Sequence, residues 1–263
     1  ENGVHMIYEP RIDGQNRKVV GHFGRNGFYY QMDKANGQFI GAGQYVNELN
    51  WTKGLDPKTG KPLEYDPKLA VQTYIPKTRT LRGDPAETAC PTWHGGVSLQ
   101  LPAFHPVKKI AYGAGAEGCF TQVVAETIPL GPNGGIDETK GGKRSGQARY
   151  TSDLYYGSIT AIDTTTHKIK AKVVLPIENR SGLTVTDGGL VFTGSQDGWV
   201  SAYDDETLRE LWRFFIGTPI KAPPMTYSVG PKQFVAVLVG GRHLHPVKYD
   251  NLDDGSYLFV FAL

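Results

Sequence analysis

The sequence predicts an all-β protein made of repeated antiparallel units. Its 263 residues are rich in turn-forming and aromatic types, with 33 glycines, 17 prolines, 14 tyrosines and 11 phenylalanines. Stretches dominated by Ala, Leu, Glu and Lys, which long helices prefer, are missing. Three segments share a pattern in which a glycine turn leads into an alternating strand that ends in Asp: 27–33, 157–163 and 198–204.

The spacing of this repeat favours a β-propeller of four-stranded antiparallel blades. The copies that begin at Gly157 and Gly198 both continue as a strand, a tight turn and a returning strand, and they lie 41 residues apart. This period fits one four-stranded blade and exceeds a leucine-rich repeat. Further strand-like segments at 18–21, 110–113, 190–194, 233–239 and 257–263 bring the inventory to roughly four blades. A β-sandwich, which needs no repeat, is the alternative.

Two long irregular stretches, at about 51–82 and 124–149, interrupt the repeats. The first carries Asp56-Pro-Lys-Thr-Gly60, and the second carries Gly131-Pro-Asn-Gly-Gly135. Loops of this length in a compact domain are usually functional or packed against a neighbour. We therefore predict a single domain over residues 1–263 with both stretches as insertions on one face.

Charge and hydropathy exclude several classes of partner. The 28 basic and 26 acidic residues give a formal net charge of +2 and are spread along the chain, so no nucleic-acid partner is expected. No apolar run approaches the ~20 residues of a transmembrane segment.

The sequence begins Glu1-Asn2-Gly3 without an initiator Met, so we expect a processed product or a piece of a longer chain.

The two cysteines, Cys90 and Cys119, lack the Cys-x-x-Cys spacing of zinc ribbons and redox motifs. From the residues alone, two buried thiols and a disulfide remain open.

His243-Leu-His245 places two imidazoles on one strand face, which is too few ligands for a metal site. Trp199 and Trp212, which belong to the repeat, are interpreted as packing between blades.

An ordered set of motifs resembles the later portion of the pyrroloquinoline quinone (PQQ)-dependent methanol and ethanol dehydrogenases. The matches run collinearly from about residue 17 to residue 241. They are Gly24-Arg-Asn-Gly-Phe-Tyr-Tyr-Gln-Met-Asp-Lys-Ala-Asn-Gly37, Asn50-Trp-Thr-Lys-Gly-Leu-Asp-Pro-Lys-Thr-Gly-Lys-Pro62, Cys90-Pro91 with His105-Pro106, Gly131-Pro-Asn-Gly134, Gly188-Gly-Leu-Val-Phe-Thr-Gly-Ser-Gln-Asp-Gly198, Leu211-Trp-Arg-Phe214 and Pro224-Met-Thr-Tyr227.

The resemblance implies about half of an eight-bladed quinoprotein propeller. It implies PQQ with Ca²⁺ or a lanthanide, oxidation of a primary alcohol or a related polyol or aldehyde, electron transfer to a cytochrome c, and a periplasmic location. The catalytic Asp and the metal-holding Glu and Asn of the family lie upstream of the segment matched by Arg25. We therefore expect the missing N-terminal half to supply them, and this chain alone to be inactive. The alternative is a cofactor-free propeller that acts as a scaffold or binding module.

The resemblance also names cofactor-binding candidates. Arg25 occupies the basic position that hydrogen-bonds the quinone oxygens, where a guanidinium stabilises developing negative charge; a solvated turn cation is the alternative. Ser98 stands where the family usually has an Asn against the cofactor, and a hydroxyl copies only part of an amide. An ordinary strand serine is as plausible there.

The segment that begins at Asn179 resembles a family loop that starts with Trp and Gly-Gly. Asn179 or Arg180 occupies the Trp position, depending on register, Ser181 replaces the first Gly, and Gly182 keeps a residue small enough for close approach of a planar cofactor. The changed neighbours put methanol as substrate in doubt.

The spacing of Cys90 and Cys119 matches a disulfide of the methanol dehydrogenases. The resemblance therefore implies that these two residues pair. A loop of this size would stabilise the fold by roughly 3 kcal/mol in the chain-entropy model, and a disulfide favours the periplasm.

Overall fold

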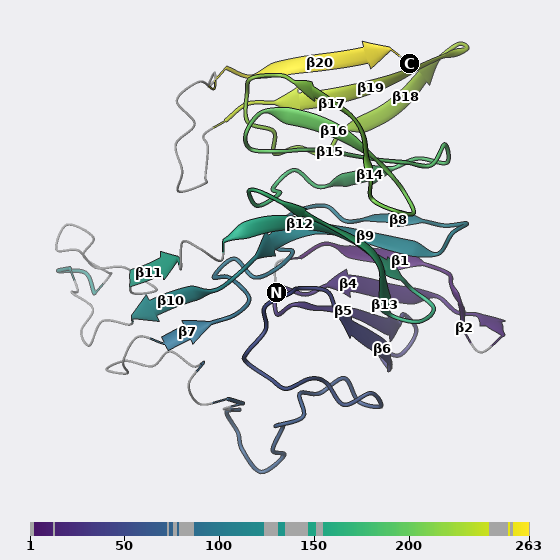
Figure 1. Ribbon diagram of the computed structural model, residues 1–263. Coiled ribbons are helices and arrows are strands. Elements are labelled where there is room, and N and C mark those ends of the chain that lie inside the picture. Colours follow the sequence, from purple (N-terminus) through teal and green to yellow (C-terminus); the bar gives the residue numbers. More distant parts are fainter. Residues whose placement is uncertain are drawn as a thin grey trace.

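The described part of the chain consists of antiparallel β-sheets, which confirms the all-β prediction. The computed structural model describes residues 3–12, 14–72, 74–75, 78, 87–123, 131–134, 147–150, 155–241, 252 and 255–262, with the backbone alone at 11–12, 122–123 and 147–150. Within these residues no helix is long and apolar enough to cross a membrane. Figure 1 shows the main sheets stacked one above another as successive blades.

Blades 1 and 2 are four-stranded. Blade 1 has the order β1 (His5–Tyr8), β4 (Val19–Phe23), β5 (Phe28–Asp33) and β6 (Phe39–Gln44), and the hairpin of β2 (Arg11–Ile12) and β3 (Gln15–Asn16) lies between β1 and β4 in the chain. Blade 2 has the order β8 (Ala103–His105), β9 (Ile110–Glu117), β12 (Tyr156–Asp163) and β13 (Lys168–Leu175).

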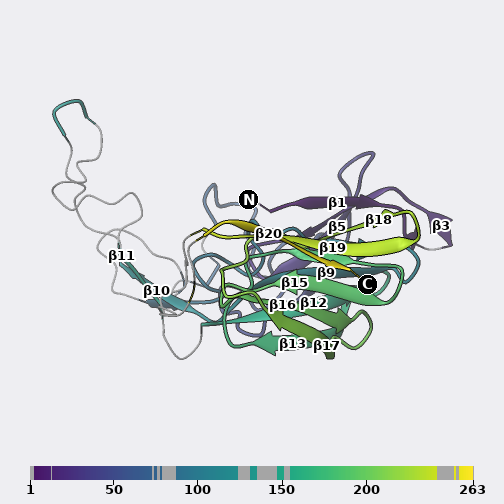
Figure 2. The ribbon, with the colours of Figure 1, turned by 90° about the horizontal axis from the view of Figure 1, so that it is seen from above.

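Blade 3 is also four-stranded, and blade 4 has three described strands. Blade 3 has the order β14 (Leu183–Val185), β15 (Leu190–Gly194), β16 (Trp199–Asp204) and β17 (Glu210–Phe215). Blade 4 has the order β18 (Met225–Val229), β19 (Lys232–Val239) and β20 (Tyr257–Ala262). A small sheet of β7 (Glu87–Ala89), β10 (Phe120–Val123) and β11 (Gln147–Tyr150) extends away from the blades (Figure 2).

The Asp that ends each repeated segment builds the hairpin turn that follows. The Oδ1 atoms of Asp33, Asp163 and Asp204 each accept a hydrogen bond from the backbone N–H two residues later, at 2.8, 2.8 and 3.1 Å. The carbonyl of each Asp accepts a second bond from the N–H four residues later, at 2.8, 2.8 and 2.9 Å. The repeat seen in the sequence is therefore a repeated Asp-capped hairpin between the third and fourth strands of a blade.

The same turn requires a left-handed residue four positions after the Asp. This residue is Gly37 in blade 1, His167 in blade 2 and Leu208 in blade 3, with φ of 72°, 59° and 54°. Glycine adopts this conformation freely, whereas an L side chain costs of order 1 kcal/mol or more. Leu208 is 2% exposed and belongs to the core between blades 2 and 3, so its burial offsets that cost.

Three apolar clusters fill the spaces between consecutive blades. Each blade therefore packs face to face against the next, as in a propeller. The most buried members are Phe23, Tyr29, Ala111 and Ile162 between blades 1 and 2, Ile110, Tyr112, Ile159 and Val191 between blades 2 and 3, and Val200, Ile220, Val235 and Val237 between blades 3 and 4.

Blade 4 presents an open face and an open edge. Among the described residues, β20 pairs only with β19. Leu238, Leu258 and Val260, which stand on the side away from blade 3, are 58%, 64% and 47% exposed. Apolar side chains of this size normally pack against another sheet. The architecture is that of a partial propeller.

Candidate functional site

The candidate residues gather at one end of the blades. Because neighbouring strands are antiparallel, the turn after the second strand and the connection after the fourth strand leave a blade at the same end. This end, called here the site end, carries the turn at 24–27 and the connections at 90–102, 176–182 and 216–224. Residues far apart in the sequence therefore meet there.

Arg25 is held by the backbone of the connection to blade 2. Its Nε donates a 2.7 Å hydrogen bond to the carbonyl of His94, and its Nη2 donates a 2.8 Å bond to the carbonyl of Trp93. The Gly96 N–H donates back to the Arg25 carbonyl at 3.1 Å. At Gly95 φ is +75°, and a Cβ there would collide with the Arg25 backbone. The connection thus folds around Arg25 and fixes the direction of its guanidinium.

Arg180 reaches the same histidine from the connection between blades 2 and 3. Its Nη2 lies 2.6 Å from His94 Nδ1, and its Nε lies 2.8 Å from Glu178 Oε1. The Glu178 side chain is fully buried, and its Oε2, 3.8 Å from His94 Nδ1, has no hydrogen-bond partner among the described residues. The cluster contains a buried ion pair with one acceptor still to be satisfied.

His94 is neutral at neutral pH. Its pKa is lowered to about 4: burial is the largest cause, the positive charges of Arg180 and Arg25 act in the same direction, and Glu178 opposes the shift. A neutral imidazole has one accepting nitrogen. Nδ1 takes that role towards the Arg180 guanidinium, because an arginine can only donate.

Asn179 and Arg180 have different surroundings. Asn179 is fully buried: its Nδ2 donates to Thr193 Oγ1 at 2.9 Å, and its Oδ1 accepts from the Ser181 N–H at 2.9 Å. These bonds pin the connection to blade 3. Arg180 is the side chain that lies beside His94.

Ser98 and Gly182 lie where two connections pack together. The Ser98 N–H donates to Gln100 Oε1 at 2.7 Å. Gly182 has φ of +94°, and a Cβ on it would lie 2.9 Å from the backbone nitrogen of Leu101. Gly182 is therefore required by the approach of these two backbones. Its contact with a cofactor, like that of Ser98, stays a prediction.

Cys90 and Cys119 form a disulfide, as the resemblance implied. It lies at the edge of an open cavity of about 610 Å³. Arg25 and five aromatic residues also line this cavity: Tyr30, Trp51, Tyr74, Trp93 and Phe120. This volume lies within the range of ~300–1,000 Å³ that is common for ligand sites.

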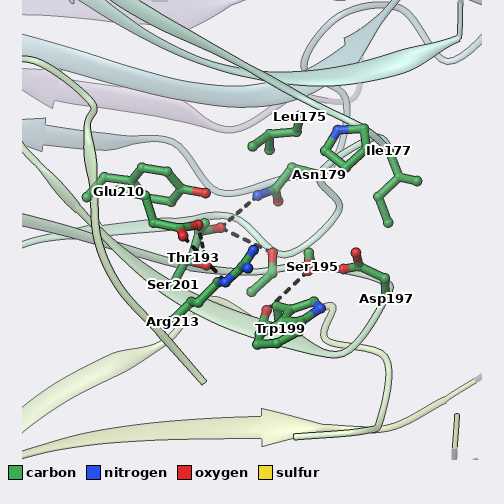
Figure 3. Close-up of a pocket in the computed structure, with 13 residues that line it drawn as sticks. Leu175, Ile177, Asn179, Thr193, Ser195, Asp197, Trp199, Ser201, Glu210 and Arg213 are labelled. Atoms are coloured by element: carbon green, nitrogen blue, oxygen red, sulfur yellow. Dashed lines mark hydrogen bonds and ion pairs between the residues drawn. The ribbon is translucent and has the colours of Figure 1, made fainter. Parts of the chain in front are cut away.

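A second cavity, between blades 2 and 3, is too small for such a ligand (Figure 3). Its volume is about 110 Å³. Trp199 lines it and packs on Phe215, with the Arg213 guanidinium 4.6 Å from the indole centre. Trp212 packs edge-on against Phe261 of blade 4. Trp212 therefore packs between blades, as predicted, whereas the ring and guanidinium contacts of Trp199 are with β17 of its own blade.

No group of three or more His, Cys, Asp or Glu in the described ranges is arranged to hold a metal ion. His243 and His245 lie outside those ranges.

His94 and Glu178 are site residues that the sequence reasoning did not assign. No local motif indicates them, because both are defined by contacts between connections distant in the chain.

Comparison with known proteins places the fold among PQQ-containing propellers. Residues 144–235 match the family model "PQQ: Glucose/ethanol/alcohol dehydrogenase, beta-propeller domain". The dehydrogenase subunit of alcohol dehydrogenase (quinone) from Acetobacter aceti is 29% identical over 98% of this chain and 35% of its own length. Lupanine 17-hydroxylase [cytochrome c] from a Pseudomonas species is 32% identical over 89% of this chain and 31% of its own length.

A solved structure supports the same relationship. The europium-containing methanol dehydrogenase superposes with a TM-score of 0.74 and 29% identity, covering 90% of this chain and 39% of that one. The chain spans about a third of the length of the curated relatives named above. The likeness therefore extends over most of this chain and over one part of each relative.

Proposed function

Because this chain belongs to the β-propeller family of PQQ-dependent alcohol dehydrogenases, we propose that it is the C-terminal part of a quinoprotein that oxidises a primary alcohol, or a related polyol or aldehyde. The observation that carries this proposal is the fixed guanidinium of Arg25. Neutral carbonyl oxygens of residues 93 and 94 position it beside an aromatic-lined cavity of about 610 Å³.

The donor set fits PQQ, a planar quinone with three carboxylates. When bound, PQQ supplies the two-electron oxidising capacity that no protein side chain has. Arg25 would donate hydrogen bonds to the quinone oxygens, where negative charge accumulates during reduction. Its rigid attachment to two carbonyls holds those donors in place before the reaction, so little reorganisation is needed. Ser98, Arg180 and Gly182 lie on connections of the same site end but outside the lining of this cavity, and we propose them as further cofactor contacts.

The other half of the propeller would supply the remaining chemistry. We propose that it provides the catalytic Asp and the ligands of a Ca²⁺ or lanthanide ion, and that a cytochrome c accepts the electrons. The europium and the cytochrome c in the names of two relatives support these assignments. The disulfide between Cys90 and Cys119 supports a periplasmic location.

The test measures PQQ binding and dye-linked alcohol oxidation in the full-length protein, with Ca²⁺ or a lanthanide. We expect Arg25→Ala to reduce turnover by about 10²–10³-fold, the usual effect of removing one electrostatic donor. Arg209→Ala is the matched control, because Arg209 is an exposed arginine in the hairpin turn of blade 3. If the intact protein binds no PQQ, the dehydrogenase proposal is wrong and a cofactor-free scaffold takes its place.

A further inference from the structure

The walls of the cavity beside Arg25 come from separate parts of the chain. Trp51 and Tyr74 belong to the irregular stretch at 51–82, Trp93 belongs to the connection that enters blade 2, and Phe120 begins β10 of the small sheet. Trp93 is 39% exposed. The irregular stretch therefore forms one wall of this cavity and contacts whatever binds there.

Trp51 is held in a fixed orientation in that wall. Its Nε1 donates a 2.9 Å hydrogen bond to the Asn26 carbonyl. Its ring meets those of Phe28 and Tyr74 edge-on, with ring centres 6.1 and 5.3 Å apart. The indole is thus positioned before any ligand binds, which lowers the entropy cost of binding.

The start of the irregular stretch is folded back on itself. The Glu64 carboxylate accepts a 2.6 Å hydrogen bond from the Thr52 hydroxyl and a 2.9 Å bond from the Lys53 N–H. A β-bridge joins Leu55 to Pro62, and Pro62 also lines the cavity. These contacts hold the aromatic wall in place from the side that faces away from the blades.

Polar groups of the walls are already engaged within the protein. Asn26 Nδ2 donates to the Tyr30 hydroxyl at 2.7 Å, and the Thr92 hydroxyl donates to the Gly95 carbonyl at 3.2 Å. Among the described residues that line the cavity, Arg25 has the one charged side chain. A ligand with many hydroxyls would lose bonds to water for groups that already have partners, whereas an apolar ligand makes no such demand.

We propose that this cavity is a substrate subsite for the ring of an aromatic primary alcohol of the benzyl alcohol class, with the hydroxyl towards Arg25. The inference rests on the proposed function and names the substrate class of that site. Trp51, Tyr74 and Trp93 are the specificity-determining residues, because aromatic rings attract one another edge-on and in offset stacks. An alcohol of one or two carbons leaves most of a cavity of about 610 Å³ unfilled, so it gains little from these walls.

The first experiment compares benzyl alcohol, ethanol and glycerol as substrates of the full-length protein with PQQ and Ca²⁺ or a lanthanide. We expect kcat/KM for benzyl alcohol to exceed that for ethanol by about tenfold or more, the discrimination that a single apolar group can give. Glycerol should be the poorest of the three substrates, since the walls engage their own polar groups.

Variants assign the preference to the cavity. Trp93→Ala keeps the backbone carbonyl that holds Arg25 and removes only the side chain. Trp93→Ala and Tyr74→Ala should each raise KM for benzyl alcohol about tenfold with kcat within about threefold, because they remove binding common to the ground and transition states. KM for ethanol should not change. Tyr65→Ala is the matched control, because Tyr65 is an exposed tyrosine of the same stretch that lies under Lys61 and outside the cavity lining.

The second experiment measures binding without catalysis. Saturation-transfer NMR follows benzyl alcohol and glycerol with the full-length protein prepared without PQQ. We expect the benzyl alcohol ring to receive saturation, and its Kd to rise about tenfold in Trp93→Ala and Tyr74→Ala but not in Tyr65→Ala.

The outcomes separate the two proposals. Benzyl alcohol binding that depends on Trp93 and Tyr74, without turnover of any alcohol, supports the subsite and refutes the dehydrogenase function. Turnover that favours ethanol or glycerol, or benzyl alcohol kinetics and binding that both variants leave unchanged, overturns the subsite and leaves the dehydrogenase function standing. Absence of both binding and turnover refutes both proposals.

Discussion

Replacing Lys172 by methionine should destabilise the contact between blades 1 and 2. Lys172 lies on β13, and its Nζ is 2.5 Å from Glu117 Oε1, 2.6 Å from the Tyr45 carbonyl and 2.9 Å from Asn47 Oδ1. The Glu117 side chain is fully buried, and that of Lys172 is 12% exposed. The ammonium therefore neutralises a carboxylate that water does not reach.

The expected loss of unfolding free energy follows from the Glu117 carboxylate that Lys172→Met leaves buried without its cation. Removing one partner of a buried ion pair costs about 3–5 kcal/mol, because the remaining charge is uncompensated. Glu117 would keep hydrogen bonds from the Asn47 N–H and the Ser158 hydroxyl, both at 2.7 Å. These bonds offset part of the loss, so we expect the lower end of the range, about 3 kcal/mol.

Urea unfolding followed by tryptophan fluorescence measures this loss. With a slope of about 2–3 kcal/mol per molar urea, Lys172→Met should lower the midpoint by about 1–1.5 M. The double variant Glu117→Gln/Lys172→Met should recover at least half of the lost stability, because glutamine carries no charge, its Oε1 can accept from the Asn47 N–H and its Nε2 can donate to the Ser158 hydroxyl. A midpoint indistinguishable from that of the wild type, or no recovery in the double variant, would refute the reasoning.

Three further predictions concern the disulfide, a close backbone approach and the site histidine. Replacing both Cys90 and Cys119 by serine should cost about 3–4 kcal/mol of unfolding free energy for a separation of 29 residues, and reduction of the wild type should match it in the same assay. Gly157→Ala places a Cβ against the Ile177 carbonyl, so we expect a loss of about 1–3 kcal/mol from overpacking; an unchanged melting temperature would contradict it. Since the pKa of His94 is about 4 in the folded protein, against an ordinary value of 6.5, the unfolded chain binds the proton more tightly, and stability should fall as the pH drops from 6.5 towards 4. His94→Asn should show a smaller fall than the wild type over that interval, and identical pH dependence would disprove the assignment.

The repeated hairpins could be predicted from the sequence because their determinants are local. Asp33, Asp163 and Asp204 hydrogen-bond to backbone groups within four residues, so the turn can be identified from a short sequence window. The left-handed conformation of Leu208 could not be predicted in the same way, since leucine rarely adopts a positive φ, and histidine, as at His167, does so only more often than other side chains. There the blade geometry overrides the local preference.

The site end was predicted only in part, because its contacts are not local. Arg25 and Arg180 were identified from the family resemblance. Their common partner, His94, is 69 and 86 residues away from them and carries no motif. Glu178 was missed for a related reason: an acidic residue after a strand usually indicates a solvated loop, and only the packing of two connections shows that it is buried.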